Sequence, residues 1–73
     1  MTPDEFLANF ADILEVSPDS ISLDTQLDSL ANWDSINVLT YMMMVDEKLS
    51  KQVDPEKVAS AQAVSDLYTI AIQ

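Results

Sequence analysis

The longest uncharged segment of the chain runs from Ser35 to Val45 and reads SINVLTYMMMV. Its apolar residues follow the 100° spacing of an α-helix, and the pattern continues to Leu49. The face expected in the core holds Val38, Tyr41, Met42, Val45 and Leu49. The opposite face holds Ile36, Thr40, Met43 and Glu47, with Leu39 and Met44 on the flanks. Because that outer face is unusually apolar for a small domain, it indicates a contact site.

A second helix is predicted near the start of the chain. Thr2 can act as N-cap, Pro3 suits the first helical position, and Glu5 can close a capping box. Apolar residues then recur at helical spacing, and the helix is expected to extend from Pro3 to Val16.

Two further helices are predicted after a second helix-start signal, an N-cap residue followed by proline. Asp54 before Pro55 predicts a short helix that ends near Ala59. Ser60 is expected to cap a last helix. The inward residues of that helix are predicted to be Ala63, Val64, Leu67, Tyr68 and Ala71.

Residues 17–34 form a long connection between the first two helices. Its apolar residues, Ile21, Leu23, Leu27 and Leu30, are spaced too irregularly for a helix or a strand. We expect a structured loop that these residues hold against the core, with a short helical turn possible between Thr25 and Leu30. The chain has no glycine, so Asn32 is the candidate for a positive φ. The prediction is an all-α, four-helix bundle that forms a single domain over residues 1–73.

The composition argues against an enzyme. Seventy-three residues leave no room for an enclosed catalytic cavity, since so short a chain buries only roughly 60% of its unfolded surface. Histidine and cysteine are both absent, which removes the usual general base, thiolate nucleophile and metal ligands. The acids of the long connection lack the glycine and final glutamate of a calcium-binding loop. We therefore expect no catalytic residue and no metal site.

The charge is strongly negative and limits the possible partners. Thirteen acids and three lysines give a net charge of −10, which disfavours nucleic acid and anionic lipid and favours basic protein surfaces. The apolar fraction of 48% is too high for a disordered chain, and no apolar run is long enough to span a membrane. The N-terminus is acidic, unlike a secretory signal. These features predict a soluble, cytoplasmic protein, which we expect to be a monomer.

Ser35 is the candidate functional residue. Its hydroxyl is expected at the N-terminus of a helix, where unpaired amides and the helix dipole favour a phosphate group. Ordinary capping of the helix by Asp34 or Ser35 is the simpler interpretation of the same residues.

The segment Asp34-Ser35-Ile36 is preceded by TQLDSLANW and followed by NVLTYMMMVDEKL. Together with the closing SAQAVSDLY, it resembles the acyl carrier protein family over nearly the whole chain. The resemblance implies a stand-alone carrier in which Ser35 bears 4′-phosphopantetheine, attached by a phosphopantetheinyl transferase that Asp34 assists. It also implies that an acyl or related intermediate is carried as a thioester. Acyl-transferring, ligating or condensing enzymes would be the partners that receive it.

Asp28-Ser29-Leu30 matches the family tripeptide more literally than the segment around Ser35 does. The helical pattern of apolar residues continues after Ser35, whereas the same offsets after Ser29 lose the pattern. Ser35 is therefore the predicted attachment residue.

The sequence departs from the family pattern in two places. Asn32 stands where the family commonly has a glycine, and the bulky Trp33 follows it. Trp33 is expected in the core, with partner contact as the alternative. The helix from Ser35 also lacks the acids typical of fatty acid synthesis carriers. We therefore predict a specialised pathway and a docking face formed by Ile36, Leu39, Met43 and Glu47. The alternative is an acidic helical protein-interaction module with no prosthetic group.

Overall fold

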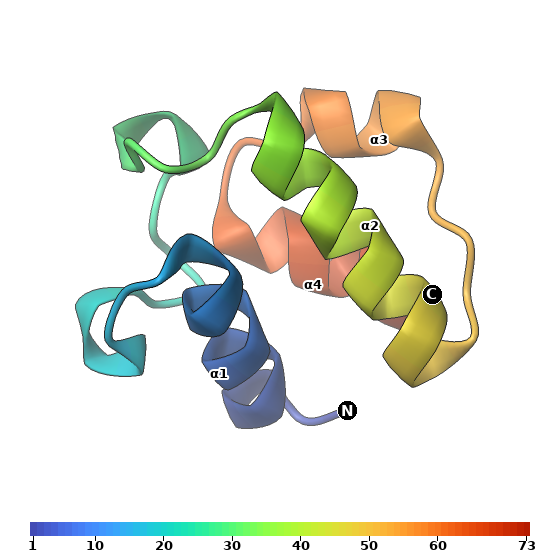
Figure 1. The fold of residues 1–73 in the computed structure, drawn as a ribbon, viewed down its shortest axis with the longest axis horizontal. Helices are drawn as coiled ribbons and strands as arrows, with labels where there is room; N and C mark the ends of the chain where they lie inside the picture. Colours follow the sequence, from blue (N-terminus) through green and yellow to red (C-terminus); the bar gives the residue numbers. More distant parts are fainter.

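A computed structural model describes residues 1–73, all of which belong to one helical unit (Figure 1). The elements are α1 (Pro3–Leu14), η1 (Pro18–Ser20), η2 (Leu27–Ser29), α2 (Ser35–Leu49), α3 (Pro55–Ser60) and α4 (Val64–Ile72), where η denotes a 3₁₀ turn. α2 packs against both α1 and α4, and α3 packs against α4. The predicted all-α bundle, with a short third helix and a long first loop, is confirmed. No helix is both long and apolar enough to cross a bilayer.

The predicted start of α1 is confirmed by its hydrogen bonds. The Glu5 N–H donates to Thr2 Oγ1 over 3.2 Å, and the Thr2 N–H donates to Glu5 Oε1 over 3.0 Å. The helix ends at Leu14, two residues before the expected Val16. Glu15 adopts the left-handed conformation at φ 59°, which ends the helical path.

α2 begins at Ser35, as predicted, and Asp34 is its N-cap. Its buried residues are Tyr41, Met44 and Val45, whereas the predicted core residues Val38, Met42 and Leu49 are only half-buried. Assigning Met44 to the flank was therefore wrong. The reason is that Tyr41 lies at the centre of the buried stripe, with Phe6 and Phe10 of α1 against its ring, and Met44 follows one turn later.

The prediction for the start of α4 was wrong. Ser60 ends α3 and donates its hydroxyl to the Glu56 carbonyl oxygen over 2.9 Å, so it does not cap the next helix. α4 begins at Val64, after Ala63 as N-cap. Asp66 accepts hydrogen bonds from the N–H groups of Gln62 and Ala63. Because alanine has no capping side chain, the first N–H groups of the helix donate instead to loop carbonyls, Val64 to Thr25 and Ser65 to Leu23.

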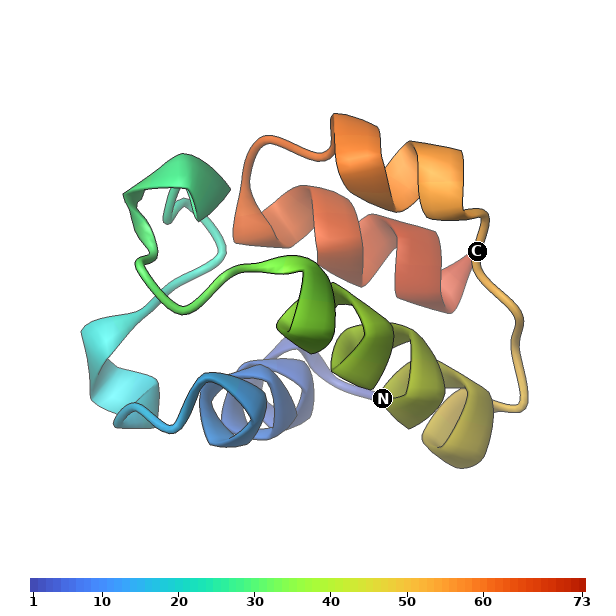
Figure 2. The same ribbon diagram turned by 45° about the horizontal axis from the view of Figure 1, so that its top comes forward.

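The long loop lies at one end of the bundle, and the α2–α3 connection lies at the other (Figures 1 and 2). Ile21 and Leu27 are buried in the core, and Leu23 and Leu30 are half-buried, which confirms that apolar residues hold this loop. Backbone hydrogen bonds add a second attachment. The Leu27 N–H donates to the Gln62 carbonyl, and the Val64 N–H donates to the Thr25 carbonyl. The loop is therefore fixed to the start of α4 as well as to the core.

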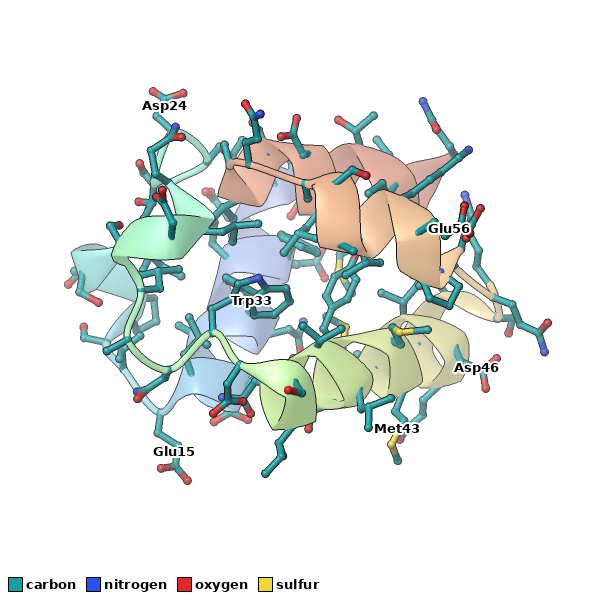
Figure 3. The ribbon with its side chains drawn as sticks, turned by 90° about the horizontal axis from the view of Figure 1, so that it is seen from above. Glu15, Asp24, Trp33, Met43, Asp46 and Glu56 are labelled. Carbon is teal, nitrogen blue, oxygen red and sulfur yellow. The ribbon has the colours of Figure 1, made fainter.

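Aromatic rings fill the space between α1 and α2. The Phe10 ring lies 5.3 Å from that of Trp33 and 6.4 Å from that of Tyr41, measured between centroids. Trp33 is half-buried and points toward these rings (Figure 3). Packing against the core, rather than full exposure to a partner, is thus the main role of this side chain.

Candidate functional site

Ser35 occupies the first position of α2, and its side chain is exposed. Its hydroxyl makes no hydrogen bond within the protein, and the N–H groups of Ser35 and Ile36 have no intramolecular acceptor. Unpaired amides at a helix N-terminus carry partial positive charge that favours an anion. An exposed hydroxyl beside such amides fits a phosphodiester, in which the serine oxygen becomes one ester oxygen.

Ser29, the alternative attachment residue, lies in a different environment. It belongs to the 3₁₀ turn η2, and its hydroxyl donates a 2.7 Å hydrogen bond to the Gln26 carbonyl. Modifying Ser29 would break this bond, whereas modifying Ser35 breaks none. The local geometry therefore favours Ser35, in agreement with the helical pattern of the sequence.

The residues around Ser35 form a chain of hydrogen bonds. Asp34 Oδ1 accepts from the Asn37 N–H over 2.9 Å, and Asn37 Nδ2 donates to the Asn32 carbonyl over 2.6 Å. Asn32 Nδ2 in turn donates to the Leu14 carbonyl over 2.8 Å. The first turn of α2 is thus linked to the last residue of α1.

The expectation of a positive φ at Asn32 was wrong, since only Glu15 and Ser50 have positive φ. The η2 turn and the hydrogen bonds of Asn32 carry the chain toward α2 without a left-handed residue. Asn37 was not identified from the sequence at all. Its position three residues after an Asp N-cap marks its amide as a capping donor, but its side-chain partner could not be read from spacing.

The predicted docking residues are all exposed on α2. Ile36, Leu39 and Met43 keep 74%, 60% and 69% of their surface exposed, and their spacing places them on one side of the helix. Met43 points away from the bundle (Figure 3). We call these three residues the α2 apolar patch. Asp34 and Glu47 are also exposed and add negative charge beside it.

A groove of about 340 Å³ adjoins the α2 apolar patch. It lies between α2 and the connection to α3, and its lining is Leu39, Met42, Met43, Asp46, Gln52 and Val53. Two residues of the patch therefore also form one wall of an apolar depression, which could receive a side chain of another protein.

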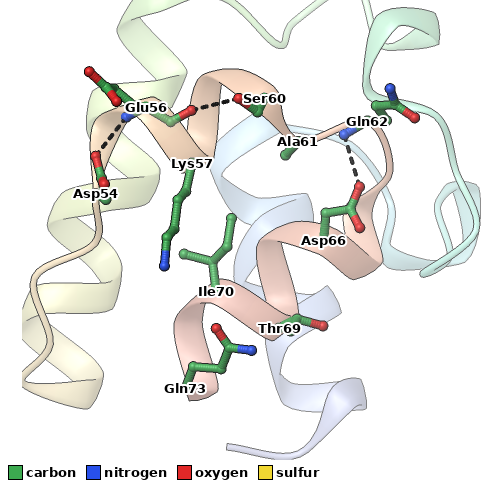
Figure 4. A pocket seen from close by; sticks show the side chains of 10 residues that line it. All are labelled: Asp54, Glu56, Lys57, Ser60, Ala61, Gln62, Asp66, Thr69, Ile70 and Gln73. Atoms are coloured by element: carbon green, nitrogen blue, oxygen red, sulfur yellow. Dashed lines mark hydrogen bonds between the residues drawn. The ribbon is translucent and has the colours of Figure 1, made fainter.

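A larger hollow of about 690 Å³ lies between α3 and α4, away from Ser35 (Figure 4). Its lining is mostly polar and includes Lys57, Ser60, Asp66 and Gln73. The Ser60 hydroxyl and the Asp66 carboxylate are already hydrogen-bonded to backbone groups. The two N–H groups, that of Gln62 foremost, hold the pKa of Asp66 below its ordinary value. The hollow contains no serine with a free hydroxyl, so it is not the candidate attachment site.

A helical bundle whose second helix opens on an exposed serine fits the class of small carrier domains. Residues 4–70 match the family described as the phosphopantetheine attachment site, and the chain therefore belongs to this family. Members carry 4′-phosphopantetheine covalently on a serine, and these domains are not themselves catalytic. Searches of curated proteins and of solved structures gave no significant match.

Proposed function

We propose that this protein is an acyl carrier protein whose 4′-phosphopantetheine is attached to Ser35. The observation that carries the proposal is the free, exposed Ser35 hydroxyl at the N-terminus of α2, beside two unpaired amides. The protein presents its cargo to partner enzymes and performs no catalysis of its own.

The attachment step is a phosphoryl transfer from coenzyme A, catalysed by a phosphopantetheinyl transferase. The Ser35 oxygen forms a bond to the phosphorus that bears pantetheine. The bond between this phosphorus and the bridging oxygen of the coenzyme A diphosphate breaks. Adenosine 3′,5′-diphosphate leaves, and the hydroxyl proton passes to a base of the transferase. When bound, the group supplies a thiol that carries an acyl or related intermediate as a thioester.

Asp34 is placed to assist this step. Its Oδ1 atom is held by the Asn37 N–H, while its other carboxylate oxygen has no partner within the protein. That second oxygen is available to the transferase or to a metal ion that the transferase holds. The carboxylate thus caps α2 and recognises the modifying enzyme through different atoms.

The α2 apolar patch, with Glu47 beside it, is the proposed docking face for partner enzymes. Acid at Asp34, Asp46 and Glu47 surrounds the patch, and the three lysines all lie between residues 48 and 57. A complementary partner surface would offer an apolar centre with a basic rim. Because the patch itself is uncharged, we propose a role in a specialised pathway, with an acyl-transferring, ligating or condensing enzyme as the partner.

Intact mass spectrometry tests the attachment. The protein is incubated with a phosphopantetheinyl transferase and coenzyme A, and we expect the mass of one phosphopantetheine to be gained, with peptide mapping to Ser35. Ser35→Ala should abolish the gain, whereas the matched control Ser29→Ala should retain it. Modification of Ser35→Ala would contradict the assignment. A wild-type protein that gains no mass would leave the acidic interaction module as the better interpretation.

The docking face has a separate test. Met43→Glu places a charge within the apolar patch, and the kcat/KM of acyl transfer by the cognate enzyme should fall about ten-fold or more. Ile72→Glu is the matched control, since Ile72 is also an exposed apolar side chain, at 51%, but lies at the end of α4. Transfer that is unchanged by Met43→Glu would rule out this face.

A further inference from the structure

The hydrogen bonds that precede α2 connect it to α1 in a single series. The Leu14 carbonyl is among the last of α1, where helical carbonyls lack partners, and Asn32 Nδ2 donates to it. The Asn32 carbonyl then accepts from Asn37 Nδ2. Two side-chain amides therefore join the end of one helix to the first turn of another, across 18 and then 5 residues of chain.

Asn37 holds the attachment segment at two points. Its backbone N–H donates to Asp34, one residue before Ser35, and its side chain holds the carbonyl of Asn32, three residues before Ser35. Trp33, between these points, packs against Phe10. The segment from residue 32 to 37 is thereby closed into a ring of contacts, and the exposed Ser35 lies within it.

We infer that Asn32 and Asn37 are positioning residues for the modification of Ser35. This inference rests on the proposed function. The two side-chain amides fix the orientation of Asp34 and Ser35 relative to the bundle. The transferase therefore binds a segment that already has the required conformation. Without them the segment samples other conformations, and the apparent affinity of the transferase falls in proportion to the competent fraction.

The test is the kinetics of phosphopantetheine transfer to variants of the whole chain. Asn37→Ala removes the side-chain link but retains the backbone N–H that Asp34 caps, and alanine favours the helix. We expect KM for the carrier to rise about five-fold, the equivalent of about 1 kcal/mol, with kcat unchanged. Asn9→Ala is the matched control, because it removes a 2.8 Å bond from Asn9 Nδ2 to the Glu5 carbonyl within α1.

A double variant separates positioning from general stabilisation. Because the two links act in series, breaking either one already interrupts the hydrogen-bonded path from α1 to the first turn of α2. Asn32→Ala combined with Asn37→Ala should therefore raise KM little more than the larger single effect. Assays are run at a temperature at which circular dichroism finds every variant folded, and Asn37→Ala alone decides the matter if Asn32→Ala does not fold.

Three results would overturn the inference. They are an unchanged KM for Asn37→Ala, an equal rise for Asn9→Ala, or fully additive effects in the double variant. Each of them presupposes that the wild-type chain is modified on Ser35. Failure of the proposed function is recognised separately, as the absence of any mass gain in the wild-type protein.

Discussion

The Tyr41 hydroxyl donates a 2.6 Å hydrogen bond to the carbonyl oxygen of Leu67, 26 positions further along the chain. The side chain of Tyr41 is fully buried, and this hydrogen bond links α2 to α4 inside the core. A buried hydroxyl without a partner would cost free energy, so this bond also explains why a tyrosine is tolerated at the centre of so small a core.

Replacing Tyr41 by phenylalanine removes this bond and leaves the ring in place. We expect the free energy of unfolding to fall by about 1 kcal/mol, and the melting temperature by about 4–8 °C. Tyr68→Phe is the control, since its hydroxyl donates over 3.3 Å to the carbonyl of the terminal residue Met1. Equal losses for the two variants in urea unfolding would contradict a special role for Tyr41.

The same hydroxyl predicts a difference at high pH. Burial raises the pKa of Tyr41 above its ordinary value of 10.0. As the pH rises, Tyr41 therefore loses its proton in the unfolded chain before it does so in the folded protein. The contribution of the Tyr41 hydroxyl to stability is complete below pH 10 and is lost as the pH rises further. Between about pH 8 and about pH 11, the wild-type protein should lose more unfolding free energy than Tyr41→Phe. Parallel losses would show that Tyr41 ionises equally in both states.

Asp66 predicts a difference at low pH. The N–H groups of Gln62 and Ala63 lower its pKa below 3.8, so its contribution to stability is present above that pH and is lost as the pH falls through the folded-state pKa. Asp66→Asn should melt at a lower temperature than wild type at neutral pH, and the gap should close in acid. Asp24→Asn is the control, because the Asp24 carboxylate accepts no hydrogen bond. A gap that persists in acid would contradict the assignment.

Two leucines test whether the long loop is part of the core. Leu27 lies in the loop with 3% of its surface exposed, and Leu39 lies in α2 with 60% exposed. Leu27→Ala should lower the free energy of unfolding by about 3 kcal/mol, and Leu39→Ala should change it by less than about 0.5 kcal/mol. Urea unfolding measures both. The reverse order would mean that the loop is not fixed to the bundle.

Much of the fold could be predicted because the signals are local. The Thr2 and Asp54 caps, each followed by proline, fixed two helix starts, and the helical spacing after Asp34 fixed a third. Capping depends on atoms within three residues of one another, so it is readable without the rest of the molecule. The exposure of the α2 apolar patch followed from the same helical period.

The errors concern residues whose partners are distant in the chain. Nothing near Asn32 indicates that its side chain reaches Leu14. Likewise, nothing near Met44 indicates that packing against α1 and α4 buries Met44 and leaves Met42 half-buried. Ser60 has the residue type of a cap, but its hydroxyl bonds backward within α3.

The sequence by itself determined that the chain is helical, that Ser35 opens a helix and that the face beyond it is apolar, because helical period and end capping are properties of neighbouring residues. Only the tertiary structure decided which hydroxyl is free, which helix faces are buried and what holds the segment before Ser35. Those outcomes depend on which segments, far apart in the chain, pack side by side.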